Sequence, residues 1–175
     1  MGYSQVRLTK CLYNVDKQIT VQLNKFGSAE AGRLAGSMKI KVPWNEGTLF
    51  DQTLDCFTKA YLKNDTIYIT GNMIGELGYG FHLILFKDSC IVAPFGLSDG
   101  KIYKYSKSDA NSIDFIPLPT KAQKVTLSKN PTYKEGDTVE GFVDLKSQPF
   151  YYTDLDGVFK IELQAYFKTE PLKKK

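Results

Sequence analysis

Aromatic residues are the side chains of this sequence whose type and spacing could do chemistry. Phe150, Tyr151 and Tyr152 are consecutive and lie in the connection between two alternating segments. Rings at the edge of a β-fold can stack on sugar rings or on bases. One hypothesis is therefore a platform for a carbohydrate or another small apolar ligand, with the following candidate residues: Phe150, Tyr151, Tyr152, Trp44, Tyr103 and Tyr105. The alternative is that a strand-rich domain exposes some of its 11 tyrosines by chance.

A catalytic role has little support from the residue types. The only histidine, His82, lies inside the apolar segment "GFHLILF", where a packing role is expected. A nucleophile normally needs such a base, and no local motif pairs Cys56 or Cys90 with His82. Two-carboxylate glycosidic chemistry needs no histidine, but its candidates are typical of turns or exposed faces: Asp51, Asp55, Glu135 and Asp137. We predict a protein without catalysis and keep a carboxylate-based glycoside hydrolase as an alternative.

Metal ligands are similarly scarce. In "TDLDG", Asp154 and Asp156 have the spacing of part of a calcium loop, but the third oxygen ligand and the distal glutamate are missing, so a plain turn is expected. Cys11, Cys56 and Cys90 are far apart and form no CxxC pair, which argues against a zinc site. One disulfide beside a free thiol is one interpretation. Burial of Cys56 and Cys90 as small apolar residues is the other, which we favour. No cofactor is predicted.

The charge distribution does not predict nucleic-acid binding. The 23 Lys and Arg against 19 Asp and Glu give a net charge of +4, but these residues are scattered rather than gathered into a stripe. The one dense basic run, residues 173–175, is expected to be a solvated tail.

No segment approaches the length of a transmembrane helix, and the first residues lack the apolar core of a signal peptide. We expect either a cytoplasmic protein or a mature domain whose signal has been removed.

Apolar residues that alternate with period two predict the strands that position these side chains. "ITVQL" (19–23) and "MKIKV" (38–42) each place their apolar residues on one face. Residues 50–57 fit either a short helix or a strand, whereas Asn64 and Asp65 predict a tight hairpin turn.

The final third alternates most clearly, with apolar residues on one face over 139–145 and again over 159–167. Roughly nine or ten strands separated by regular turn signals predict an all-β, antiparallel β-sandwich with one short helix at most. The alternative is a lipocalin-like β-barrel. A single domain over residues 1–175 is expected, with a subdomain seam near 117–121, where two prolines interrupt strand hydrogen bonding.

Two resemblances add to this reading. "YKEGDTVEGFVDL" (133–145), followed by "FKIELQAYFK" (159–168), resembles the strands of arrestin-type sandwiches. The layout of "AYLKNDTIYITG", "GFHLILF" and "GDTVEGFVDL" is similar to small β-sandwich domains of uncharacterised secreted or lipid-anchored bacterial proteins. The second resemblance implies a periplasmic or cell-surface location, and neither resemblance transfers a functional residue.

Together these observations predict a non-catalytic recognition or structural domain of the bacterial cell envelope. Its expected partner is a glycan or another envelope protein. A carbohydrate-binding or small-ligand-binding module that uses the exposed aromatic residues is the main alternative.

Overall fold

The computed structural model describes residues 10–25, 32–42, 45–48, 52–73, 79–97, 103–104, 115–118, 120–152 and 157–175. These residues form one helix and fifteen strands: β1 (Lys10–Leu12), β2 (Asn14–Val15), α1 (Gln18–Lys25), β3 (Arg33–Val42), β4 (Asn45–Thr48), β5 (Gln52–Lys63), β6 (Thr66–Met73), β7 (Tyr79–Phe86), β8 (Ser89–Leu97), β9 (Tyr103–Lys104), β10 (Phe115–Pro117), β11 (Thr120–Leu127), β12 (Glu140–Ser147), β13 (Tyr151–Tyr152), β14 (Lys160–Lys168) and β15 (Lys173–Lys174).

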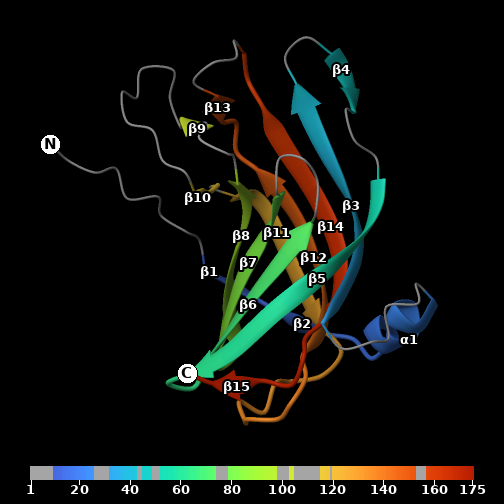
Figure 1. The fold of residues 1–175 in the computed structure, drawn as a ribbon, viewed down its shortest axis with the longest axis vertical. Helices are drawn as coiled ribbons and strands as arrows, with labels where there is room; N and C mark the ends of the chain where they lie inside the picture. Colours follow the sequence, from blue (N-terminus) through green and yellow to red (C-terminus); the bar gives the residue numbers. More distant parts are fainter. Residues whose placement is uncertain are drawn as a thin grey trace, which may run out of the picture.

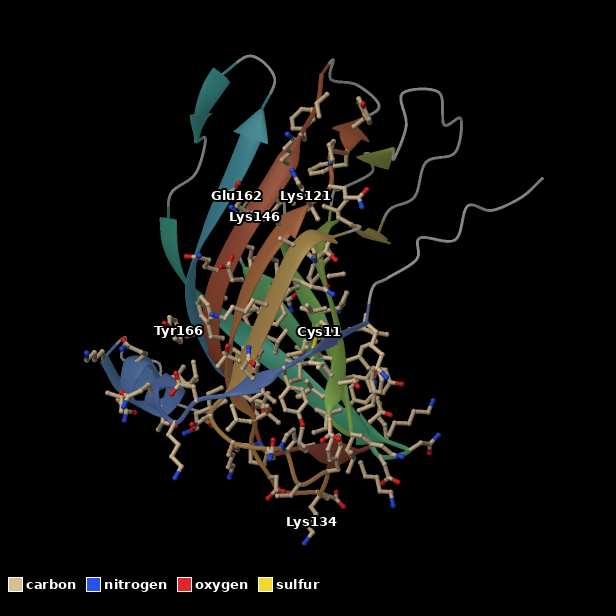
Figure 2. All side chains as sticks on the ribbon, turned by 180° about the vertical axis from the view of Figure 1, so that it is seen from behind. Cys11, Lys121, Lys134, Lys146, Glu162 and Tyr166 are labelled. Carbon is tan, nitrogen blue, oxygen red and sulfur yellow. A yellow bond between two sulfur atoms is a disulfide. The ribbon has the colours of Figure 1, made fainter. Side chains whose placement is uncertain are left out.

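The strands make two sheets that pack together (Figure 1). Hydrogen bonding follows the order β1-β8-β7-β6-β5-β3-β14-β12-β11-β2, with β4, β10 and β15 paired off this path and a separate β9–β13 pair. In Figure 1 the green strands β6 to β8 lie in front of the orange strands β11 and β12, and Figure 2 shows the layers from behind. The predicted antiparallel sandwich with one short helix is confirmed, and the alternative closed barrel is not formed by the strands that the structure describes.

The core lies between the inward faces of the two sheets. Alternate residues of β7 and of β14 are almost fully buried, as the period-two pattern predicts. The rings of Phe81 on β7 and Phe167 on β14 meet across the sandwich, with centroids 5.7 Å apart. Each ring also lies over a glycine of the neighbouring strand, Gly71 and Gly141, where a Cβ atom would overlap it. Each large apolar side chain buried here stabilises the fold by about 1.5–3 kcal/mol.

The predicted strand over residues 19–23 is wrong, because this segment lies in helix α1. Ile19 and Leu23 are buried one helical turn apart, whereas Val21, between them, is 45% exposed. The Asp16 carboxylate accepts a hydrogen bond from the backbone N–H of Gln18 at 2.9 Å and caps the helix. Ile19 and Leu23, at i and i+4, fit both periods, whereas Val21, at i+2, fits only the strand period and lies on the exposed side of the helix. No helix in the described part of the chain has the length and apolarity needed to cross a membrane.

Three other segments show where the local sequence pattern does and does not predict the strand pairing. Residues 52–57, for which helix and strand were both open, belong to β5, and the hairpin turn at Asn64 and Asp65 is confirmed by φ angles of 48° and 54°. Strand β3 begins at Arg33, inside a glycine-rich stretch. The end of the chain is not a solvated tail: β15 pairs in parallel with β5, and the preceding Leu172 is 1% exposed.

Residues 10–15, here called the N-terminal strap, connect the two sheets. β1 pairs with β8, and β2 pairs in parallel with β11. A disulfide joins Cys11 to Cys90, which face each other in the β1–β8 pair with Cα atoms 5.2 Å apart (Figure 2). Between the two strands, the Tyr13 hydroxyl donates a hydrogen bond to the Lys87 carbonyl at 2.8 Å. The strap is therefore held at both sheets.

The disulfide corrects the favoured interpretation of the cysteines. Cys90 is fully buried, but as half of a disulfide rather than as a free thiol. The side chain of Cys56 lies outside the described residues. In the region of the predicted seam, Leu118 is fully buried, and its backbone N–H donates to the Pro94 carbonyl at 2.8 Å.

Candidate functional site

Phe150 is a core residue and does not belong to an exposed platform. It is 0% exposed, and its ring lies 5.9 Å from the ring of Phe159. Backbone hydrogen bonds of 3.0 and 2.9 Å join the two residues in both directions. Phe150 is therefore not an exposed ring as the platform hypothesis expects, because this pair closes the end of the core beside β14.

The other predicted aromatic residues are only partly described. Tyr151 and Tyr152 form β13, which pairs with Tyr103 and Lys104 of β9. Tyr151 is partly buried. The remaining predicted positions, or their side chains, lie outside the described residues: Tyr152, Tyr103, Trp44, Tyr105, Asp154 and Asp156. Because Asp154 and Asp156 lie outside the described residues, the structure does not test the calcium-loop alternative. Among the described residues, no group of three or more potential metal ligands occurs.

A different set of residues converges on the outer face of the β5–β8 sheet, the layer nearer the viewer in Figure 1. Tyr61 on β5 faces Tyr68 on β6, which faces Ile84 on β7, which in turn faces Ile91 on β8. All four side chains are partly exposed, while their sequence neighbours point into the core. We call this row the aromatic strip. Lys10 on β1 continues the row, so that four strand spacings of ~4.8 Å give it a length of ~19 Å.

Lysine side chains lie at both ends of the aromatic strip. The Lys175 ammonium is 4.1 Å from the centroid of the Tyr61 ring, and the Lys10 ammonium is 5.0 Å from the centroid of Phe86, beside the other end. Tyr61 and Tyr68 stack with centroids 4.9 Å apart and planes 10° apart. This stacking covers one face of each ring and leaves the ring edges, the phenolic hydroxyls and the second faces for other contacts.

The same face carries charge of one sign. Outward positions alternate with core positions along β5, so Lys59 and Lys63 flank Tyr61 on the outside. Among the residues of β1 and β5–β8 whose side chains the structure describes, Lys10, Lys59 and Lys63 are the charged ones at outward positions. The face is thus apolar and aromatic along the strip and cationic around it.

The outer face of the other sheet has a different character. Lys146 on β12 pairs with Glu162 on β14 at 3.5 Å, and Lys168 on β14 pairs with Glu140 on β12 at 3.1 Å. In Figure 2 the labelled Lys146 and Glu162 lie together over these two strands. Two lysines of this face are therefore paired with carboxylates of the same sheet, while Lys124 and Lys160 are exposed there as well. Among the described residues, no such ion pair involves the lysines around the aromatic strip.

His82 contacts an aromatic ring and a hydroxyl group of the same sheet. The His82 ring stacks on the Phe95 ring at 4.5 Å, and its Nδ1 lies 3.1 Å from the Thr70 hydroxyl. Burial lowers the pKa of His82, which favours the neutral imidazole. Cys90 is oxidised to a disulfide and cannot attack a substrate as a thiolate. These contacts fit the predicted packing role of His82.

No family model, curated protein or solved structure matches the chain. The resemblances to arrestin-type strands and to bacterial β-sandwich domains therefore stay predictions.

The aromatic strip was missed in the sequence, although a signal for it was present. The hairpin "AYLKNDTIYITG" assigns Leu62 and Ile67 to the core, so alternation places Tyr61 and Tyr68 on the opposite face. Likewise, "GFHLILF" is apolar on both faces. The pairing register, which brings the rings of two strands into one row with the isoleucines, needs the structure.

A second polar cluster anchors helix α1 to the other sheet. The Glu140 carboxylate accepts a hydrogen bond from the Thr20 hydroxyl at 2.7 Å in addition to its ion pair with Lys168. Burial alone would raise the pKa of this carboxyl, but hydrogen bonds from Thr20 and Lys168, the Lys168 charge and a hydrogen bond from Ser128 hold the pKa below its ordinary value of 4.5. Each contact joins a neighbouring element to β12, which is a structural role.

Glu140→Gln is expected to lower the free energy of unfolding at neutral pH by about 1–2 kcal/mol, because hydrogen bonds to a charged group are lost. A carboxylate with a lowered pKa stabilises the fold above its ordinary value of 4.5, and this contribution disappears as the pH falls through the folded-state pKa. The wild type should therefore approach the variant in acid. Urea unfolding of both proteins over a pH series measures this, and a stability gap that persists in acid would contradict it.

Proposed function

We propose that the protein is a non-catalytic recognition domain of the bacterial cell envelope that binds its partner through the outer face of β5–β8. The observation that carries this proposal is the contrast between the two outer faces. The outer face of one sheet holds two ion pairs between its own carboxylates and lysines, whereas the other presents a row of apolar and aromatic side chains surrounded by lysines. Aromatic and apolar centres within a polar rim are typical of recognition surfaces.

The envelope location is supported by the disulfide. Structural disulfides persist in oxidising compartments such as the periplasm and are rare in reducing cytoplasm. Cys11 and Cys90 are brought together by the β1–β8 pairing itself. The location proposed from the resemblance and the location that suits the disulfide therefore agree.

Tyr68→Glu is expected to reduce binding to a bacterial envelope preparation, containing membrane and wall polymer together, by about 10-fold or more. The variant places a carboxylate among the lysines and removes a ring from the strip. Sedimentation of the purified protein with the preparation measures the bound fraction.

The matched control is Tyr166→Glu on the other sheet. Tyr166 is also partly exposed and also belongs to an aromatic pair, with its centroid 4.5 Å from that of Phe142. The control should bind like the wild type. Equal losses in the two variants, or a wild type that does not bind, would remove the support for this face.

A further inference from the structure

We infer that the surface recognised by the β5–β8 face is an anionic lipid bilayer, on which the domain docks peripherally. This inference rests on the proposed function, because it names the partner of the same face. It depends on three features of the described residues: the sign of the charge, the chemistry of the strip and the apolar side chains at its margins.

The charge of the face complements an anionic membrane. Four lysines surround the aromatic strip, and they come from three separate segments of the chain: Lys10, Lys59, Lys63 and Lys175. The negative surface potential of an anionic leaflet attracts each lysine that lies close to it. A lysine can also lay its aliphatic stem along apolar surface while its ammonium reaches the head groups. Because these four lysines are spread around the whole strip, all four ammonium groups can contact negative charge at once only on an extended anionic surface.

The side chains of the strip suit the boundary between head groups and acyl chains. Tyrosine is enriched at this boundary because the ring is apolar and the hydroxyl is polar. Tyr61 and Tyr68 present ring edges and hydroxyls, and Ile84 and Ile91 continue the row with purely apolar surface. A row of this kind can enter the polar boundary of a bilayer without leaving a buried hydrogen-bonding group unsatisfied.

Exposed apolar side chains lie at two margins of the face. Leu12, two residues beyond Lys10 on β1, is 75% exposed, and Phe57, two residues before Lys59 on β5, is 39% exposed. Single exposed apolar residues are ordinary on soluble proteins. Here, however, both alternate with a lysine of the same face, which is the composition of interfacial membrane-binding surfaces.

Two other occupants fit the geometry less well. A sugar ring would stack on an open aromatic face, but Tyr61 and Tyr68 each cover one face of the other and Lys175 lies over the Tyr61 ring, which leaves one face of Tyr68 at most. A second copy of the chain would bring lysines against lysines, which is unfavourable.

The test uses extruded vesicles and the purified, oxidised full chain. Vesicles of phosphatidylglycerol and phosphatidylethanolamine should sediment the protein, whereas phosphatidylcholine vesicles should leave it in the supernatant. Binding should fall by at least about 10-fold when the salt concentration is raised from roughly 0.05 to 0.5 M, because the attraction is screened. Inorganic phosphate at the same phosphorus concentration should not compete, since it offers no extended surface.

Paired lysine variants separate this face from general charge. Lys59→Ala with Lys63→Ala should lower partitioning into the anionic vesicles by about 25-fold, or about 5-fold for each lysine. Lys124→Ala with Lys160→Ala removes the same charge from exposed positions of the second sheet and should change partitioning less than about 3-fold. Both variants alter exposed side chains and should melt like the wild type.

Each outcome decides between the alternatives. Equal losses in the two double variants would overturn the inference, as would equal binding to phosphatidylcholine. If the envelope preparation binds the protein through Tyr68 but anionic vesicles do not, the inference fails and the proposed function stands. Polygalacturonate that binds with vesicle-like affinity would assign the face to an acidic glycan instead. If neither the envelope preparation nor the vesicles bind, both proposals fail.

Discussion

Removal of the disulfide by the double variant Cys11→Ala/Cys90→Ala is expected to lower the free energy of unfolding by about 4 kcal/mol. The bond closes a loop over a sequence separation of 79, and the unfolded chain regains the conformational freedom of that loop when the bond is absent. The melting temperature should fall by roughly 10 °C in a domain of this size. Urea unfolding and thermal scans under non-reducing conditions measure both changes.

Dithiothreitol provides the internal control for this prediction. It should destabilise the wild type to a similar extent and leave the double variant unchanged, because the variant has no disulfide to reduce. Equal stability of the oxidised and reduced wild type would show that the remaining strap contacts suffice. Those contacts are the short β1–β8 and β2–β11 pairings and the Tyr13 hydrogen bond to Lys87.

The strap also links the disulfide to the candidate site. It carries Lys10, which extends the aromatic strip at the β8 edge, and the exposed Leu12. Burial, helped by the Asp88 carboxylate, raises the pKa of Tyr13, so that its hydroxyl stays protonated and keeps its hydrogen bond at neutral pH. The oxidised protein thus holds the strap side of the β5–β8 face in place through both a covalent bond and a polar contact.

The fold class could be predicted from the sequence because strand alternation is a local signal. The residues over 139–145 and 159–167 alternate in the sequence and pair as β12 and β14 with their apolar faces buried. Helix α1 was missed because Ile19, Val21 and Leu23 alternate as in a strand, although Ile19 and Leu23 at i and i+4 also fit a helix, which Asp16 caps. The disulfide was left open because its formation depends on which strands become neighbours, and sequence spacing alone does not contain that information.

The candidate site was harder to predict because exposure is a property of the assembled sheets. Consecutive rings at Phe150–Tyr152 looked like a binding patch, but Phe150 faces Phe159 inside the core. Tyr61 and Tyr68 looked like ordinary strand residues, yet the hairpin register sets them side by side on the outside. Neighbours in the sequence point to opposite faces of a strand, so adjacency along the chain is a poor guide to a shared surface.

Phe150→Ala tests this distinction directly. It should lower the free energy of unfolding by about 3–5 kcal/mol, because a large cavity replaces a ring that is 0% exposed. The part of the sample that remains folded should bind anionic vesicles as the wild type does, since the residue does not reach the β5–β8 face. Urea unfolding measures the first effect, and vesicle sedimentation at low temperature, where the folded fraction is greatest, measures the second.

Two further variants test whether the loss of stability in Phe150→Ala comes from lost core packing. Phe150→Leu keeps most of the apolar volume and should cost less than Phe150→Ala, whereas Tyr151→Ala, at a partly buried neighbouring position, should change the free energy of unfolding by about 1 kcal/mol or less. A ligand contact would produce the opposite order, with full stability and lost binding in the Phe150→Ala protein. That result would return Phe150 to the candidate site and would require the end of the core beside β13 to open when the partner binds.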